Sequence, residues 1–221
     1  MASKHDLMSA LRCSGVVVVL RTETANDLVE VAKAVHAGGI KFIEITLTVP
    51  GALEVIRDAV QQLTGLEVYV GAGTVLDAQS ARAAILAGAS FVVSPIFDQP
   101  TVDLCRGYGV TVMPAGLTPG EIYQAWKGGA DVVKVFPAKS MGGADYIKAI
   151  KEPLPQVELV PTNGVDFETA AGFIKAGALA VGLGSAIVSK ALLAARDFEA
   201  ITANARRMIE LIAAAKSGVP G

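Results

Sequence analysis

The chain has 221 residues, of which 52% are hydrophobic and 18% charged, with a formal net charge of −2. So small a charge gives no electrostatic basis for binding nucleic acid or an anionic membrane surface. Its two cysteines, Cys13 and Cys105, are too few for a disulfide framework and lack metal-ligand spacing, which indicates thiols in a reducing compartment.

The N-terminal residues are charged and amphipathic, and they predict a short helix over residues 3–13. They lack the apolar core of a signal peptide, and no apolar run is long enough to cross a bilayer. We therefore expect a soluble cytoplasmic protein.

From residue 16 onward, short apolar runs alternate with segments of helical periodicity. The runs predict strands at 16–20, 41–47, 67–71, 91–94, 110–113, 131–137, 157–161 and 179–183. The periodic segments predict helices near 27–37, 50–63, 77–87, 100–107, 118–127, 143–150, 166–175 and 197–215, most of them followed by glycine.

Regular alternation of this kind implies a parallel sheet covered by helices. Eight units favour a (β/α)8 TIM barrel with a short extra N-terminal helix, and an open doubly wound sheet is the alternative. No linker or composition break appears, so we expect one domain over residues 1–221, with a disordered tail at about 216–221.

One strand carries an unusual charge: Lys134 lies within D-V-V-K-V-F-P, residues 131–137. A buried amine is costly and therefore rare unless it is paired or used. Alternation along the strand places Lys134 on one face with Val132 and Phe136. Because the other face is apolar, as contact with helices requires, Lys134 is predicted to point into the barrel.

Alternation in the second strand places Glu44 on the interior face as well. The second and sixth strands lie opposite each other in an eight-membered ring, whose interior is narrow enough for side chains to meet. The pair therefore predicts an amine nucleophile beside a general acid/base, and a buried salt bridge is the alternative. Attack requires the neutral amine, which burial and a nearby Arg21 favour and a Glu44 carboxylate disfavours.

Other polar groups follow the strands at the same end of the sheet. Arg21 could hold a substrate carboxylate, and Thr74 and Thr162 could hydrogen-bond it; a rim ion pair or local backbone bonds are the alternatives. Residues 161–165 and 182–186 end the last two strands, where barrels often bind phosphate through loop amides such as those of Gly184 and Ser185. These glycines could equally be simple turns.

Metal and cofactor sites are not expected. His5 and His36 lie away from every strand end, and the acidic residues show no ligand spacing. Lys139 is expected to be a solvated loop charge.

Seven motifs in register resemble the 2-keto-3-deoxy-6-phosphogluconate (KDPG) aldolases, class I enzymes related to the 4-hydroxy-2-oxoglutarate (KHG) aldolases. They are V-V-V-V-L-R, F-I-E-I-T-L-T-V-P, G-A-G-T-V, V-S-P, M-P-A-G, V-V-K-V-F-P-A and V-P-T-N-G-V. The resemblance implies a barrel, usually a homotrimer, that needs no cofactor and cleaves its substrate to pyruvate and glyceraldehyde 3-phosphate.

The resemblance also assigns roles to residues. It implies that Lys134 forms the Schiff base, that Glu44 is the general acid/base and that Arg21 binds the carboxylate. The remaining positions line the pyruvate site (Thr74, Pro95, Pro114, Phe136, Thr162) or the phosphate loops (Asn163, Gly164, Gly184, Ser185).

The chain departs from the pattern of many members at two positions: Asn163 stands where they have a glycine of the phosphate loop, and Lys139 stands where they have a glutamate. The arginine that binds the carboxylate also differs between branches of the family: one branch has it at the position of Arg21, and other members place it where this chain has Thr48. Alternative functions are therefore KHG aldolase, an aldolase for the 6-phosphogalactonate epimer, and a non-catalytic phospho-sugar binder or assembly scaffold.

Overall fold

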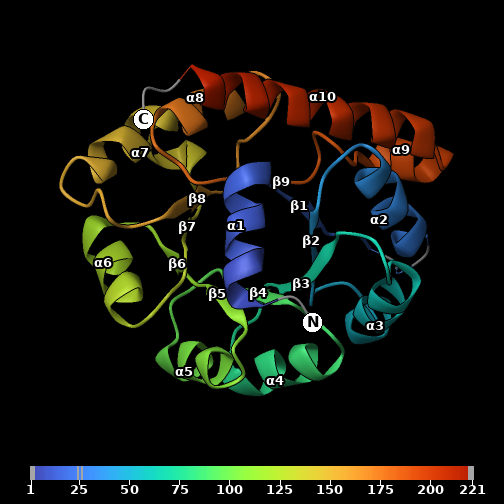
Figure 1. The fold of residues 1–221 in the computed structure, drawn as a ribbon, viewed down its shortest axis with the longest axis horizontal. Coiled ribbons are helices and arrows are strands. Elements are labelled where there is room, and N and C mark those ends of the chain that lie inside the picture. The colour runs from blue at the N-terminus through green and yellow to red at the C-terminus, as the bar shows by residue number, and fades with distance from the viewer. Residues whose placement is uncertain (1–2, 24, 26, 219–221) are drawn as a thin grey trace.

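The computed structural model describes residues 3–23, 25 and 27–218. Within these residues, helices α2 to α10 surround the strands and α1 crosses the centre (Figure 1). The strands are β1 (Val16–Leu20), β2 (Phe42–Thr46), β3 (Tyr69–Gly73), β4 (Phe91–Val93), β5 (Thr111–Met113), β6 (Ala115–Gly116), β7 (Val133–Val135), β8 (Leu159–Pro161) and β9 (Val181–Leu183). The helices are α1 (Lys4–Ser14), α2 (Leu28–Ala37), α3 (Ala52–Gln62), α4 (Ala78–Leu86), α5 (Gln99–Gly107), α6 (Pro119–Lys127), the 3-10 helix η1 (Lys139–Met141), α7 (Ala144–Lys151), α8 (Ala170–Lys175), α9 (Lys190–Ala195) and α10 (Phe198–Ser217).

All strand pairs are parallel, which confirms the predicted parallel α/β architecture. The strands form a six-stranded sheet in the order β5-β4-β3-β2-β1-β9 and a three-stranded sheet in the order β6-β7-β8. Hydrogen bonds join the two sheets at both edges: Asp131 N donates to Val112 O, and Leu179 N donates to Leu159 O. The structure has one strand more than the eight predicted, the two-residue strand β6. Pro114, which has no N–H to donate, separates β6 from β5.

The interior of the curved sheet holds its own apolar cluster, built from alternate residues of the strands. Leu7 and Leu11 of α1 pack against it from one end. The other members are Val17, Phe42, Tyr69, Phe91, Val93, Met113 and Val160 of the strands, together with Val132 and Ala180, each directly before a strand. Val133 and Val135 belong instead to the larger cluster beneath the outer helices. The predicted division of side chains between the two faces is confirmed.

Local hydrogen bonds explain where the element boundaries differ from the prediction. Helix α8 begins at Ala170 rather than near residue 166, because the Asp166 carboxylate accepts bonds from the amides of Glu168 and Thr169 and holds a turn there. Helix α10 continues to Ser217, into the segment predicted to be a disordered tail, and residues 219–221 lie outside the described residues.

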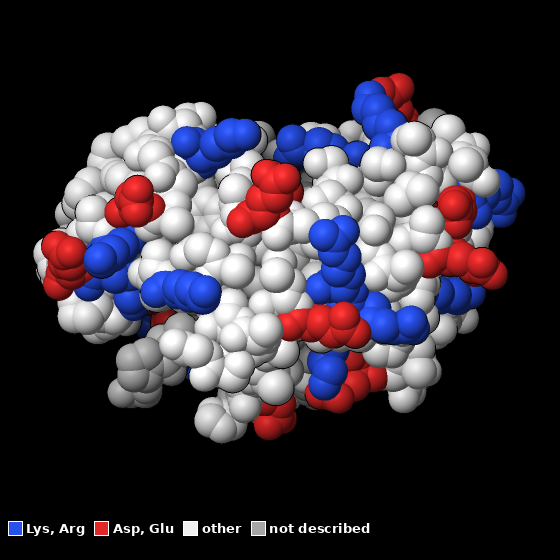
Figure 2. Space-filling view, turned by 90° about the horizontal axis from the view of Figure 1, so that it is seen from above, with Lys and Arg blue, Asp and Glu red and all other residues white. Residues whose placement is uncertain are grey.

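The surface carries charges of both signs. On the face shown in Figure 2, lysine and arginine side chains are interspersed with aspartate and glutamate. Within the described part of the chain, no helix combines the length and hydropathy needed to span a membrane.

Candidate active site

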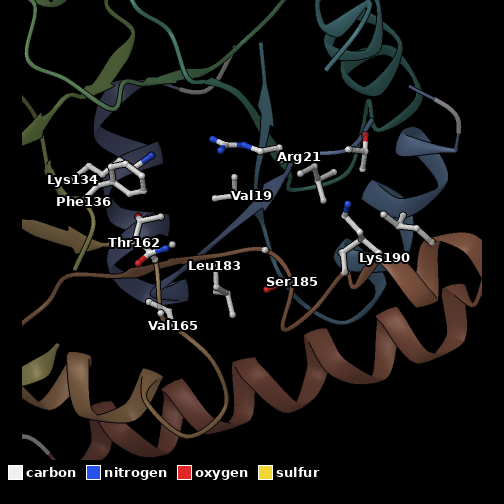
Figure 3. A pocket seen from close by; sticks show the side chains of 17 residues that line it. Val19, Arg21, Lys134, Phe136, Thr162, Val165, Leu183, Ser185 and Lys190 are labelled. Atoms are coloured by element: carbon white, nitrogen blue, oxygen red, sulfur yellow. The ribbon is translucent and has the colours of Figure 1, made fainter. Parts of the chain in front are cut away.

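A cavity of about 360 Å³ opens where β1, β7, β8 and β9 end. Of the described residues that form its wall, three carry cationic side chains, Arg21, Lys134 and Lys190, and none carries a carboxylate. The other residues that line it are Val19, Leu20, Thr22, Phe136, Thr162, Asn163, Gly164, Val165, Gly182, Leu183, Gly184, Ser185, Val188 and Leu193. In Figure 3, Lys134, Phe136 and Thr162 lie together on one side of this cavity and Lys190 lies on the other. Its electrostatic character favours an anionic ligand.

Lys134 lies in the middle of β7 and is only 5% exposed. Its Nζ lies 5.2 Å from the centre of the Phe136 ring, within the range of a cation–π contact. It borders both the cavity of about 360 Å³ and a second, smaller cavity of about 10 Å³. The amine is therefore buried in the protein and still reachable from the pocket.

Glu44 reaches the small cavity from β2 and is 2% exposed. Its carboxyl lies against Gly73 of β3, where any Cβ atom would collide with it. Burial raises the pKa of Glu44 above its usual range, although the positive charges of Lys134 and Arg21 act in the opposite direction.

Glu44 and Lys134 both border the small cavity, whose volume is close to that of one water molecule. Among the described residues, Glu44 Oε1 has no hydrogen-bond partner, and no ion pair within 4.0 Å joins Glu44 to Lys134. The alternative of a direct buried salt bridge is therefore contradicted. The arrangement suits an amine and a carboxyl group that exchange protons through a water or through substrate.

Arg21 follows β1 and points its guanidinium toward the side of the pocket that holds Lys134 (Figure 3). Its Nη2 donates to Thr74 Oγ1 at 3.0 Å, so the structure brings these two predicted residues together. Thr74 has φ +56°, a left-handed conformation that is strained for a β-branched residue. Thr46 Oγ1, bonded to Thr48 Oγ1, also lies 3.3 Å from Leu20 O and fixes the backbone that precedes Arg21.

The loop after β8 contains the residues predicted to contact pyruvate and phosphate. Thr162 packs against Gly182 of β9, where a side chain would collide with its hydroxyl. Asn163 and Gly164 both adopt positive φ, +78° and +74°, and asparagine tolerates this conformation better than most residues. The stem of Lys139 lies over Gly164, where a Cβ atom would collide with it.

Several backbone donors face no protein acceptor in this region. Among the described residues, the amides of Gly164, Val165 and Ser185 form no hydrogen bond to another protein group. Unpaired amides beside a pocket of positive charge are typical of an anion-binding loop.

Three positions predicted to line the pyruvate site lie apart from the 360 Å³ cavity. Pro95 lines a neighbouring cavity of about 730 Å³, and Phe136 is the residue that the two cavities share. Pro114 is buried beside β5. Thr74 is likewise absent from the cavity wall and reaches the site through Arg21.

Sequence reasoning missed Lys190 and Gly73. Lys190 begins α9, and a lysine at the start of a helix carries no sequence signal that distinguishes it from a solvated surface charge. Gly73 lies in the G-A-G-T segment, but only the structure shows that the Glu44 carboxyl packs against Gly73, two residues beyond Gly71, the register partner of Glu44. In the described residues, no group of three His, Cys, Asp or Glu side chains is arranged to hold a metal ion.

The chain is similar to known proteins over most of its length. The family model "KDPG and KHG aldolase" matches residues 7–204. The 2-dehydro-3-deoxy-phosphogluconate aldolase of Treponema pallidum is 34% identical over 93% of this chain and 97% of its own. The KHG/KDPG aldolase of Escherichia coli K12 is 31% identical over 94% of this chain and 96% of its own.

The solved structures add a chemical comparison. A KDPG aldolase from Legionella pneumophila, with pyruvate captured as a covalent carbinolamine intermediate, superposes with a TM-score of 0.81. It is 25% identical, and the match covers 91% of this chain and 97% of that one. The chain therefore belongs to the KDPG and KHG aldolase family of Schiff-base lyases.

Proposed function

We propose that this protein is a class I aldolase that cleaves 2-keto-3-deoxy-6-phosphogluconate to pyruvate and glyceraldehyde 3-phosphate. One observation carries the proposal: Lys134 is buried, borders the large pocket, and shares a water-sized cavity with Glu44. Among the described residues, neither has a direct ion-pair partner that would explain its burial structurally.

In this proposal Lys134 attacks the C2 ketone of the substrate and forms a carbinolamine. Loss of water gives an imine, which is protonated. Glu44 removes the proton of the C4 hydroxyl, the C3–C4 bond breaks, and its electron pair moves into the imine to form an enamine. Glu44 then returns a proton to the enamine carbon, and hydrolysis releases pyruvate and the Lys134 amine.

The other residues bind and orient the substrate. Arg21 holds the substrate carboxylate with a fork of donors whose position Thr74 fixes. Thr162 and Phe136 contact the pyruvate portion, and Pro95 lines the neighbouring cavity, which Phe136 also borders. The phosphate binds to the amides of Gly164, Gly184 and Ser185, beside Asn163.

Reductive trapping tests the chemistry. Borohydride added with pyruvate should reduce the imine and leave a stable adduct on Lys134, located by peptide mass spectrometry. Lys134→Met should form no adduct and should show no pyruvate release. An adduct on another lysine, or turnover in Lys134→Met, contradicts the mechanism.

Substrate comparison tests the specificity. The cationic pocket wall and the unpaired loop amides favour a phosphorylated substrate over 4-hydroxy-2-oxoglutarate. We expect a higher kcat/KM for the phosphorylated acid, and the gluconate and galactonate epimers should be assayed side by side. Equal values with and without phosphate favour the KHG aldolase alternative, and binding without pyruvate release favours the non-catalytic binder.

We also propose that the two sheets close into one (β/α)8 barrel forming a single domain over residues 1–221. Hydrogen bonds at both sheet edges and the shared interior cluster support closure.

A homotrimer is proposed from the family resemblance, with the exposed Tyr123–Trp126 pair on α6 as candidate contact surface. Light scattering measures the mass of the oligomer directly.

Two free thiols, Cys13 and Cys105, support the proposal of a reducing, cytoplasmic location.

A further inference from the structure

Lys190 has no role in the chemistry described above, yet its side chain lines the pocket. It lies on the side opposite Lys134, beyond Ser185 in the view of Figure 3. A substrate whose ketone reaches Lys134 therefore extends its far end toward Lys190. The unpaired amide of Ser185 lies in the segment between them along the same wall.

The amine of Lys190 is held by a carboxylate from another segment. Its Nζ pairs at 2.8 Å with Glu23 Oε1, which follows β1 beyond Arg21. The two side chains are 91% and 85% exposed, and water screens such a pair so that it contributes little to stability. An anion with more than one negative charge can therefore displace Glu23 readily.

We propose that Lys190 binds the distal phosphate monoester of the substrate, and that Glu23 is an internal competitor that occupies Lys190 until the phosphate arrives. This inference rests on the proposed function, because it names a specificity-determining contact of the same pocket. We call this ion pair between the segment after β1 and the start of α9 the latch: the substrate phosphate replaces Glu23 as the partner of Lys190.

A second ion pair between the same segments offers a matched control. Arg196, just after α9, pairs at 2.9 Å with Asp27, just before α2, and neither residue lines the pocket. If Lys190 served only to tie α9 to the β1–α2 segment, removal of the Arg196–Asp27 pair would have a similar effect on ligand binding.

The test measures binding of glycerol 3-phosphate, a stable three-carbon phosphate monoester, by titration calorimetry, with glycerol as the uncharged probe. Lys190→Met should weaken binding of the phosphate ester about tenfold, as expected for loss of a charged hydrogen bond. Lys190→Arg should restore most of it, and Arg196→Met should leave it within about twofold of the wild type. Glu23→Gln should strengthen binding about two- to threefold, and less so at high salt.

The double variant distinguishes a latch from a general charge effect. Glu23→Gln should have no effect on binding once Lys190 is methionine, because the competition requires both partners. Equal gains from Glu23→Gln with and without Lys190 overturn the latch. Unchanged binding in Lys190→Met, an equal loss in Arg196→Met, or no binding of glycerol 3-phosphate to the wild type overturns the inference about Lys190.

Failure of this inference is separable from failure of the proposed function. The wild-type protein is also tested for the borohydride-trapped pyruvate adduct on Lys134. An adduct together with unaffected binding in Lys190→Met rejects only the latch. Absence of the adduct rejects the aldolase mechanism, while the calorimetric comparison still decides whether Lys190 binds the phosphate.

Discussion

Gly73→Ala is the sharpest test of how the sheet positions Glu44. The added carbon would overlap Oε1 of Glu44 and lie 2.5 Å from its Cδ and 2.6 Å from its Cγ, whereas ordinary contact begins near 3.4 Å. The carboxyl must therefore retreat by at least about 1 Å, and a misplacement of about 1 Å costs roughly 100-fold in rate. This corresponds to about 2.7 kcal/mol in the activation free energy.

Overpacking of the interior should also lower the free energy of unfolding, by about 1–3 kcal/mol. For a domain of this size, each kcal/mol lowers Tm by about 2–4 °C. The assay is kcat/KM for pyruvate release, measured well below the Tm found by circular dichroism. Folding is thereby separated from catalysis.

Gly107→Ala is the matched control, because a Cβ atom at that helical position meets nothing within 4 Å. It should keep wild-type kcat/KM and a Tm at least as high. Wild-type kcat/KM in Gly73→Ala would show that the close approach of Glu44 to β3 is irrelevant to the reaction, and would refute the argument that Gly73 positions Glu44.

Further predictions concern pH, the carboxylate clamp and the phosphate loop. Because burial raises the pKa of Glu44 above 4.5, the folded state favours the neutral carboxyl group. Protonation of Glu44 therefore stabilises the folded protein below pH 4.5, and this stabilisation is lost as the pH rises through the raised pKa. The unfolding free energy of the wild type minus that of Glu44→Gln should accordingly fall as the pH rises above about 4.5 in urea titrations, and a rising difference contradicts the assignment. Arg21→Lys should raise KM for the substrate about tenfold with a smaller change in kcat, since a lysine cannot keep both a forked contact and the bond to Thr74; an unchanged KM places the carboxylate elsewhere. Asn163→Ala should destabilise the protein by about 1 kcal/mol, whereas Asn163→Gly should not, because φ is +78° there; equal stability of the two variants argues against the left-handed conformation.

Local pattern was sufficient to predict much of this fold. The residues of β1 were predicted without error, and alternation placed Lys134 and Glu44 on the interior face, because strand periodicity and the cost of a buried charge are local properties. The amino-acid sequence alone was therefore enough to single out this pair. Whether Lys134 and Glu44 form a direct salt bridge or lie across a cavity could not be predicted, since that depends on the spacing of two distant strands.

Other features depend on register and on loop geometry. A glycine is required at Gly73 because the Glu44 carboxyl packs against it, and at Gly182 because the Thr162 side chain packs against it. In sequence, Lys190 resembles any lysine at the start of a helix. Only the structure shows that the preceding loop places its side chain at the pocket wall. Pro95 is predicted in the pyruvate site but lines the adjoining cavity, which Phe136 also borders.

Helix α1 has a practical consequence for anyone who builds on this protein. Its residues Leu7 and Leu11 fill the end of the interior cluster that lies at the starts of the strands. The pocket opens at the strands' carboxyl ends, so substrate and a protein fused ahead of Ser3 approach from opposite sides. A display tag or an immobilising linker attached at that end leaves the entrance unobstructed, whereas deletion of α1 would expose the interior cluster to solvent.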